Sequence, residues 1–298
     1  MSFRQNHQIT SKLVGGLGNQ LFSYFAGYDL AFRRGAQLRL DVSDIRSGKS
    51  VHSVSIESLE LPGVFFHKAE NDVLLRKYAY KIKMMLRRKI PILNRLSHEY
   101  VSPVIGFDPN VFNNSTNSIF GYFQSYKYFY PYREIFQDLK LRNPSNWYLE
   151  TVARKDFRNS VAIHVRRGDY SKLSDTYGLL SGDYYRDAVS TMRILKPNCH
   201  FSIFSDDMSL AKSMLSEFLP QNTLWINQPD NGDSAESMVL MSKTSGHIIA
   251  NSTFSWWGAA LNNNECPVIA PAEWFKSMWA PLDLYPPDWI LVKSSWEN

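Results

Sequence analysis

The feature that most constrains the fold is a regular alternation of short β-branched runs with longer segments of helical period. From residue 161 onward, each apolar run is followed by a segment whose apolar residues recur every three or four positions. This is the pattern of βα units, in which helices cover both faces of a parallel sheet. The pattern predicts strands at 161–165, 200–204, 223–226, 248–250 and 268–270, with helices at 183–195, 208–218, 234–243 and 253–262.

The N-terminal part has the same pattern once. A strand at 9–14, a turn at Gly15–Gln20, a helix at 21–34 and a strand at 36–41 form one βαβ unit. With 298 residues, the chain has room for two domains. We expect an α/β protein with two Rossmann-like domains, 1–157 and 158–298. Five prolines and six of the eight tryptophans follow residue 255, which predicts irregular structure and a short helix packed back on the body.

The positive charge is concentrated in one segment. The formal net charge is +5, yet residues 73–98 contain eight Lys or Arg and no acid, and the other 25 basic residues are outnumbered by 28 acidic ones. Apolar residues of a helix predicted at 72–89 fall on one face, which is typical of a helix that binds a membrane surface. We expect peripheral membrane contact through 73–98. The alternative is a solvated helix packed on the N-terminal domain.

Other classes are disfavoured by what the sequence contains. The N-terminus is polar, no run approaches ~18 apolar residues, and the two cysteines form no CxxC. We expect a cytoplasmic protein, located at the inner face of the cytoplasmic membrane if the basic segment binds lipid. No nucleic-acid partner is expected, because the basic residues are not spread over a groove with interleaved aromatics and no known module is present.

Polar residues follow three of the predicted strands, where ligands bind in open α/β sheets. The first strand contains His164 near its end and runs into Arg166, Arg167 and Asp169. A guanidinium matches phosphate oxygens, so this strand end predicts diphosphate binding. Adjacent residues of a strand point to opposite faces, so only one arginine should face the ligand. The alternative is a salt-bridged surface turn.

The second strand ends in Ser205, Asp206 and Asp207. These carboxylates suit ribose hydroxyls or a guanine edge, and one of them is expected to cap the next helix. A DxD motif is lacking here, so we expect no essential metal.

The third strand breaks at Asn251, and Ser252 or Thr253 suits the N-cap of the next helix. Free amides and the helix dipole then favour a phosphate, with the Ser255 hydroxyl in the first turn. Trp256 and Trp257 suit stacking on a base or sugar, or simple core packing.

Near the N-terminus, Gly16, Gly18 and Asn19 belong to a GxG loop between a strand and a helix. Such a loop lets backbone approach a phosphate closely, although it is a weak signal by itself.

Taken together and in this order, GGLGNQLF, HVRRGDY, FSDD and IIANSTFSWWGAAL resemble glycosyltransferase family 11, the bacterial α-1,2-fucosyltransferases. The resemblance covers residues 13–261. It implies a GT-B fold, with two Rossmann-like domains facing each other across a cleft. GDP-L-fucose would be held mainly by the C-terminal domain and the acceptor by the N-terminal one. Where family members often carry Asp, this chain has Ser237.

Except for Phe254, the family motifs fall on residues already identified at the strand ends. The first covers His164, Arg166, Arg167 and Asp169, the second covers Asp206 and Asp207, and the third covers Ser252, Phe254 and Ser255.

The resemblance implies inverting transfer of L-fucose from GDP-β-L-fucose to the 2-hydroxyl of a β-galactoside, in oligosaccharide or surface polysaccharide (O-antigen) synthesis. Arg166, or failing that Arg167, would carry the diphosphate charge, and Asp169 or His164 would serve as base. No cofactor is expected. The residues expected to bind the donor are Gly16, Gly18, Asn19, Arg166, Arg167, Ser205, Asp206, Asp207, Asn251, Ser252, Thr253, Phe254 and Ser255.

Two alternatives stay open. One is a GT-B transferase for another GDP-sugar or linkage. The other is a non-catalytic sugar-nucleotide-binding protein.

Overall fold

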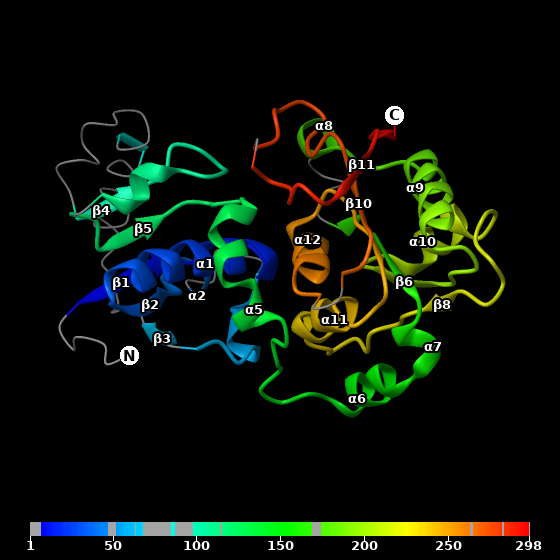
Figure 1. Ribbon diagram of the computed structural model, residues 1–298, viewed down its shortest axis with the longest axis horizontal. Helices are drawn as coiled ribbons and strands as arrows, with labels where there is room; N and C mark the ends of the chain where they lie inside the picture. The colour runs from blue at the N-terminus through cyan, green and yellow to red at the C-terminus, as the bar shows by residue number, and fades with distance from the viewer. Residues whose placement is uncertain are drawn as a thin grey trace. The chain divides into compact units, whose positions relative to one another are not determined.

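The computed structural model describes residues 7–46, 52–62, 64–67, 85–86, 98–113, 115–168, 174–262, 265–281 and 283–297. The chain forms two compact units. Unit 1 comprises Met1–Glu57, Leu61–Tyr132 and Pro281–Tyr285, and unit 2 comprises Ser58–Glu60, Arg133–Ala280 and Pro286–Asn298. Each unit is built around one parallel sheet (Figure 1).

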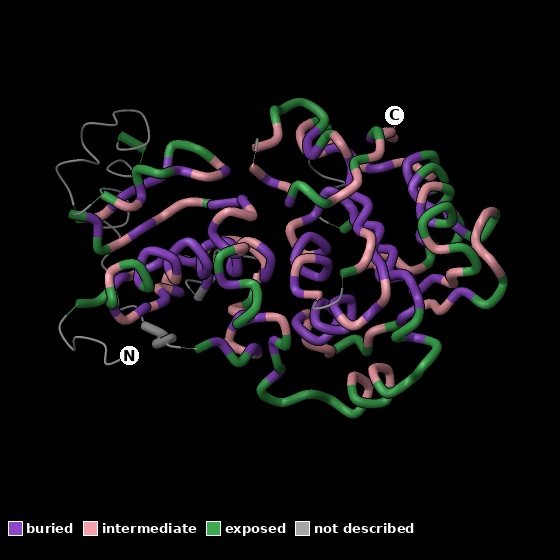
Figure 2. The backbone as a smooth tube through the Cα atoms, in the orientation of Figure 1, coloured by how far each residue is buried: buried purple, intermediate pink, exposed green. Residues whose placement is uncertain are grey.

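The sheet of unit 1 has the order β3-β2-β1-β5-β4, and all of its strand pairs are parallel. Its helix α1 (Leu17–Arg34) follows β1, is buried along most of its length (Figure 2), and ends at Gly35, whose φ of 58° is left-handed. The strands are β1 (Gln8–Lys12), β2 (Gln37–Asp41), β3 (Val64–His67), β4 (Glu99–Val101) and β5 (Ser118–Phe120). The short helices are α2 (Ser43–Arg46), η1 (Ser55–Ser58), η2 (Pro109–Phe112), η3 (Tyr126–Tyr128) and η4 (Tyr130–Tyr132).

The sheet of unit 2 has the order β11-β10-β9-β6-β7-β8 and is also parallel throughout. Its strands are β6 (Val161–Val165), β7 (Phe201–Ser205), β8 (Leu224–Trp225), β9 (His247–Ile248), β10 (Val268–Pro271) and β11 (Ile290–Val292). Its helices are α5 (Arg133–Phe136), α6 (Asn146–Ala153), α7 (Lys155–Arg158), α8 (Ser174–Tyr177), α9 (Gly182–Leu195), α10 (Met208–Leu215), α11 (Ser234–Met241) and α12 (Thr253–Ala260).

Strand β6 contributes to two hydrophobic clusters, one with helices α9 and α10 and the other with α11 and α12. These helices lie on either side of the sheet (Figure 1). Val161, Ile163 and Val165 pack in the cluster that includes α9 and α10. Ala162 packs in the other cluster, which includes residues of α11 and α12. Side chains of a strand alternate between its two faces. Odd-numbered positions of β6 therefore face α9 and α10, and even-numbered positions face α11 and α12.

The chain changes direction across the sheet of unit 2 at β6. From β6 it continues to β7 and β8 on one side, and then returns to β9 on the other side. The carboxyl ends of β6 and β9 thus flank the topological switch point, where open α/β sheets bind ligands. In unit 1 the switch point lies between β1 and β5 by the same reasoning.

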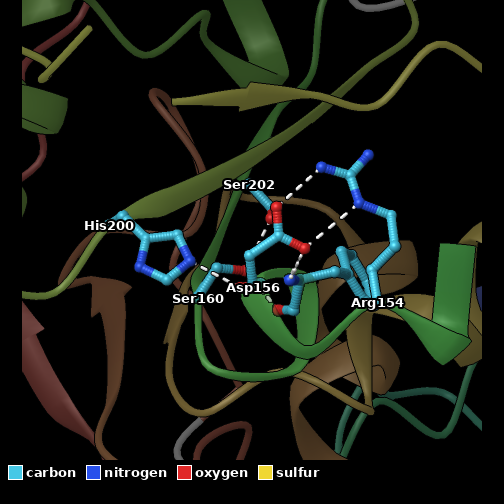
Figure 3. Close-up of polar contacts among 6 residues, drawn as sticks. Arg154, Asp156, Ser160, His200 and Ser202 are labelled. Atoms are coloured by element: carbon cyan, nitrogen blue, oxygen red, sulfur yellow. Dashed lines mark hydrogen bonds and ion pairs between the residues drawn. The ribbon is translucent and has the colours of Figure 1, made fainter. Parts of the chain in front are cut away.

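At the opposite edge of the sheet, polar contacts connect the amino-terminal ends of β6 and β7 (Figure 3). Arg154 forms an ion pair with Asp156 at 2.7 Å, and the His200 ring contacts the Asp156 carbonyl. The hydroxyls of Ser160 and Ser202, both fully buried, hydrogen-bond to each other. These contacts join α7 to the starts of two strands, at the edge of the sheet away from the switch point.

Residues 133–157, which the sequence pattern assigned to the N-terminal domain, pack in unit 2. One reason is that Ser145, the N-cap of α6, hydrogen-bonds to α11. The Ser145 hydroxyl donates a hydrogen bond of 2.8 Å to the buried Glu236 carboxylate of α11, and the backbone amide of Ser145 donates to the other oxygen.

The proline-rich C-terminal part differs from the expected short helix. Its described residues contain the strand β11, which extends the sheet beside β10. The packing back on the body is present, because Trp296 forms an isolated antiparallel bridge with Leu180. Within the described ranges, no helix combines the length and the apolar character needed to cross a membrane.

Candidate active site

The two arginines after β6 have opposite environments. Arg167 continues the odd-numbered face, and its side chain is 6% exposed. Its Nη2 donates to the Leu180 carbonyl at 3.0 Å, and its Nη1 lies 2.7 Å from Oε2 of Glu297. The guanidinium of Arg167 is therefore committed to internal contacts of unit 2, and it does not face the switch point as a ligand-binding group would.

Arg166 continues the even-numbered face, on the side of α12. Its side chain is 24% exposed, and its Nη1 lies 2.7 Å from Oδ2 of Asp206. The sequence predicted that only one of the two arginines faces the ligand. Arg166 is the more accessible of the two, and its role in donor binding stays a prediction.

The two aspartates after β7 also divide their roles. Asp207 caps α10, because its Oδ1 accepts a hydrogen bond of 2.9 Å from the Leu210 amide. Asp206 accepts from the Arg167 amide at 2.8 Å through one oxygen and pairs with Arg166 through the other. The Ser205 hydroxyl donates to the Asp207 carbonyl at 3.0 Å. Asp206 thus connects the ends of β6 and β7.

Gly168 lets these two strand ends approach closely. A Cβ atom at this position would lie 2.5 Å from Oδ2 of Asp206 and 3.8 Å from Cζ of Arg166. A side chain there would have to displace the carboxylate that pairs with Arg166.

Beyond β9, the first turn of α12 points its amides toward the switch point. Ser252 occupies the N-cap, and among the described contacts its hydroxyl does not cap the helix. Thr253 and Phe254 are half-buried, so the start of the helix is partly accessible. An N-terminal turn with uncapped amides favours an anion.

Asn251 and Ser255 contribute differently from the expected ligand contacts. The Asn251 amide donates to the carbonyls of Tyr177 and Gly178 at 2.9 and 3.2 Å. The Ser255 hydroxyl is fully buried and donates to the Ser252 carbonyl at 3.1 Å. Both side chains hold the surrounding backbone in place.

Trp256 and Trp257 belong to the core rather than to a stacking surface. Both are fully buried, and their rings meet edge to face at 4.8 Å.

His164 lies under Arg166 on the same face of β6. Its ring packs on Phe254, with the centroids 5.5 Å apart. Burial, together with the positive Arg166, lowers the pKa of His164 from 6.5 to about 3. At neutral pH the imidazole is therefore uncharged. The other candidate base, Asp169, lies outside the described residues.

The glycine loop lies in unit 1, at the carboxyl end of β1. Gly15 has a φ of 68°, and Gly16 is the N-cap of α1. Gly18 is already inside the first turn of the helix, which begins four residues earlier than the sequence pattern indicated. Oδ1 of Asn19 accepts a hydrogen bond of 3.0 Å from Gln124. The role of Gly16, Gly18 and Asn19 in donor binding stays a prediction.

The profile of Glycosyl transferase family 11 matches residues 96–293, a span that holds all the motifs of unit 2 described above. The chain belongs to this family. The alpha-1,2-colitosyltransferase of Escherichia coli is 27% identical over 96% of this chain and 99% of that protein. The O-antigen biosynthesis glycosyltransferase WbnK of Escherichia coli is 30% identical over 89% of this chain and 94% of that protein.

A mammalian relative and a solved structure are also similar. The galactoside 2-alpha-L-fucosyltransferase SEC1 of Bos taurus is 26% identical over 45% of this chain and 38% of that protein. The crystal structure of NodZ alpha-1,6-fucosyltransferase soaked with GDP-fucose superposes with a TM-score of 0.54 at 14% identity, over 90% of this chain and 96% of that one. This likeness confirms an α/β fold of the GT-B type.

The sequence motifs of this family 11 glycosyltransferase did not reveal the roles of two residues in the candidate site. Glu297 contacts Arg167 but lies 130 residues later in the sequence, so no local sequence pattern connects the two. Gly168 is inside a motif, but its role depends on Asp206, which follows a different strand. Among the described residues, no group of three or more His, Cys, Asp and Glu side chains is arranged to hold a metal ion.

Proposed function

We propose that this family 11 enzyme transfers L-fucose from GDP-β-L-fucose to the 2-hydroxyl of a β-galactoside, with inversion at the anomeric carbon. The observation that carries the proposal is the half-buried Arg166 at the switch point of unit 2. It follows β6 on the same face as His164, whose ring packs on Phe254 in the uncapped first turn of α12. Arg166 and this first turn both favour negative charge, and the leaving group of this reaction is a diphosphate. A nucleoside diphosphate sugar is therefore the donor class that suits the site.

In this reaction the main task of the protein is to stabilise the charge that develops on GDP as the glycosidic bond breaks. Arg166 supplies a permanent positive charge, and the amides of Thr253 and Phe254 supply the partial charge of a helix N-terminus. His164 is a weak candidate for the base, because its lowered pKa makes the imidazole a poor proton acceptor. We retain Asp169 as the proposed base. Because protein groups supply this charge, we propose that the reaction needs no divalent metal.

The names of the relatives support the linkage and the class of acceptor. The relatives that match nearly the whole chain include an alpha-1,2-colitosyltransferase and an O-antigen biosynthesis glycosyltransferase, and SEC1 is a galactoside 2-alpha-L-fucosyltransferase. We propose that the acceptor is a galactose-terminated glycan of a surface polysaccharide. The first of these relatives favours a second candidate function, transfer of colitose to the same position, because it matches 96% of this chain.

Contact with a membrane through residues 73–98 also stays a proposal. All but Met85, Leu86 and His98 of this segment lie outside the described residues. Such contact would bring a cytoplasmic enzyme to an acceptor carried on lipid. Binding to vesicles with and without anionic lipid tests it, and equal binding to both would count against it.

Donor and acceptor are best tested together by measuring GDP release. The purified enzyme is incubated with GDP-fucose, GDP-mannose or a GDP-linked colitose donor, each with a panel of β-galactosides. We expect acceptor-dependent release from GDP-fucose. A preference for the colitose donor would support the second candidate, and GDP-fucose binding without release on any galactoside would indicate a non-catalytic protein.

A further inference from the structure

Residues 295–297 lie antiparallel to residues 179–181, the segment that leads into α9. The Ser181 amide donates to the Ser295 carbonyl, and the Glu297 amide donates to the Leu179 carbonyl, both at 2.8 Å. Between these bonds, Leu180 and Trp296 form the antiparallel bridge. The 295–297 segment is thus fixed by backbone pairing to the stretch whose Leu180 carbonyl accepts from Arg167.

The Trp296 ring reinforces this pairing. It occupies the space over Gly178, where a Cβ atom would lie 2.4 Å from Cε3 of the ring. Gly178 has a φ of 77°, a left-handed conformation that favours glycine. Its carbonyl accepts from Asn251, which follows β9. The same short stretch therefore joins the 295–297 segment to the end of β9.

Glu297 uses this anchored position to neutralise Arg167. The two side chains are 2.7 Å apart, and they are 38% and 6% exposed respectively. Within the described part of the chain, Nε and Nη1 of Arg167 form no hydrogen bond, so Nη1 contacts Glu297 as an ion pair. The Leu180 carbonyl and the Glu297 carboxylate are consequently the main groups that compensate the charge of this arginine. A buried charge that loses its partner is strongly unfavourable.

We infer that Glu297 is a positioning residue for Arg166, acting through Arg167. Because neighbouring side chains on a strand point to opposite faces, holding Arg167 toward Leu180 and Glu297 leaves Arg166 on the face of the donor site. Oδ2 of Asp206 pairs with Arg166 on that face. Without the Glu297 charge, the buried Arg167 guanidinium loses its ionic partner and the backbone that carries it shifts. That shift displaces the Asp206 carboxylate, because Oδ1 of Asp206 accepts from the Arg167 amide at 2.8 Å while its other oxygen pairs with Arg166. The inference rests on the proposed function, in which Arg166 binds the diphosphate.

The test compares Glu297→Gln, Glu297→Asp and the wild-type enzyme. GDP affinity is measured by calorimetry, kcat and both KM values by GDP release, and folding by thermal unfolding. For Glu297→Gln we expect GDP affinity and kcat to fall ~10- to 100-fold with little change in the acceptor KM, since small displacements of a charged group have effects of this size. Glu297→Asp keeps the charge and should recover most of the loss.

Glu217→Gln is the matched control, because Glu217 is an exposed carboxylate 3.5 Å from Arg186. It should behave as wild type. If Glu297→Gln does not fold, Trp296→Leu replaces it, since this variant keeps the carboxylate but removes the ring over Gly178. We expect it to lower kcat and GDP affinity in the same direction.

Three results would overturn the inference. Glu297→Gln, or Trp296→Leu in its place, with kcat and GDP affinity within about twofold of wild type overturns it alone. A loss that follows thermal stability and that Asp does not restore indicates a merely structural residue, which also overturns it. A wild-type enzyme that neither binds GDP nor releases it from GDP-fucose overturns the proposed function, and the inference falls with it.

Discussion

Nη1 of Arg166 lies 2.7 Å from Oδ2 of Asp206, and the two side chains are about equally exposed, at 24% and 25%. The pair joins the carboxyl ends of β6 and β7 on the side that faces α12. A diphosphate bound at the first turn of α12 would meet this guanidinium. In the proposed reaction, Asp206 orients Arg166, and Arg166 carries the charge of the leaving group.

Replacing Arg166 by Ala should lower kcat by ~10²- to 10³-fold, because one preorganised charged donor to the leaving group is lost. The measurement is GDP release from GDP-fucose in the presence of a galactoside. Arg154→Ala is the control, since Arg154 also pairs with an aspartate at 2.7 Å but lies at the opposite edge of the sheet (Figure 3). A folded Arg166→Ala enzyme with near-normal turnover would remove Arg166 from the mechanism.

Gly168→Ala should impair activity more than folding. The new methyl group would lie 2.5 Å from Oδ2 of Asp206, so the carboxylate must move away from Arg166. We expect kcat/KM for the donor to fall by up to ~100-fold, because a small misplacement of a charged group near the reacting atoms can have an effect of this size. Gly182→Ala is the control, because its Cβ would be 3.4 Å from Met214, an ordinary contact. Equal activity of the two variants would contradict the role given to Asp206.

The low pKa of His164 predicts acid destabilisation. Its pKa is about 3 in the folded protein and 6.5 as a free side chain, so between these values the unfolded chain binds a proton that the folded protein does not. Stability from this group is present above pH 6.5 and falls as the pH is lowered, by about 2 kcal/mol between pH 6.5 and pH 5.

Urea unfolding across this pH range measures the effect. In His164→Gln the pH dependence should be smaller by that amount, while the contribution of His247, whose pKa burial also lowers to about 3, stays the same. Parallel curves for the variant and the wild type would show that His164 titrates normally.

Removing divalent metal should leave turnover unchanged, because Arg166 and the amides of α12 supply the positive charge. The test is GDP release with an excess of EDTA. Loss of activity that Mg²⁺ or Mn²⁺ restores would contradict this part of the proposal.

Much of unit 2 was predictable because its strands are apolar on both faces. The structure places β6 at the predicted residues, 161–165, and its five side chains are all buried. The strands β3, β4, β5 and β11 were missed, because these short runs lie outside the regular alternation of strand and helix patterns that revealed the others. The start of α1 was also mispredicted. Gly16 has an extended backbone conformation and is the N-cap, so the helix begins at Leu17, whereas the sequence suggested a longer glycine loop.

The site was predictable in composition but not in orientation. Strand alternation predicts that Arg166 and Arg167 point apart, yet which one is buried depends on Leu180 and Glu297, which are distant in sequence. Likewise, the sequence allowed the Asn251 amide to face a ligand. In the structure this amide donates to the carbonyls of Tyr177 and Gly178, which are distant in sequence. Contacts between separate segments decide such questions, and local motifs do not contain them.

The most direct test of the proposed function is the structure of the product formed from GDP-fucose and a β-galactoside, determined by NMR. The account predicts a single new sugar, α-linked L-fucose on the 2-hydroxyl of galactose, formed together with GDP. Fucose on another hydroxyl, fucose with retained configuration, or no transfer from GDP-fucose to any galactoside would contradict it.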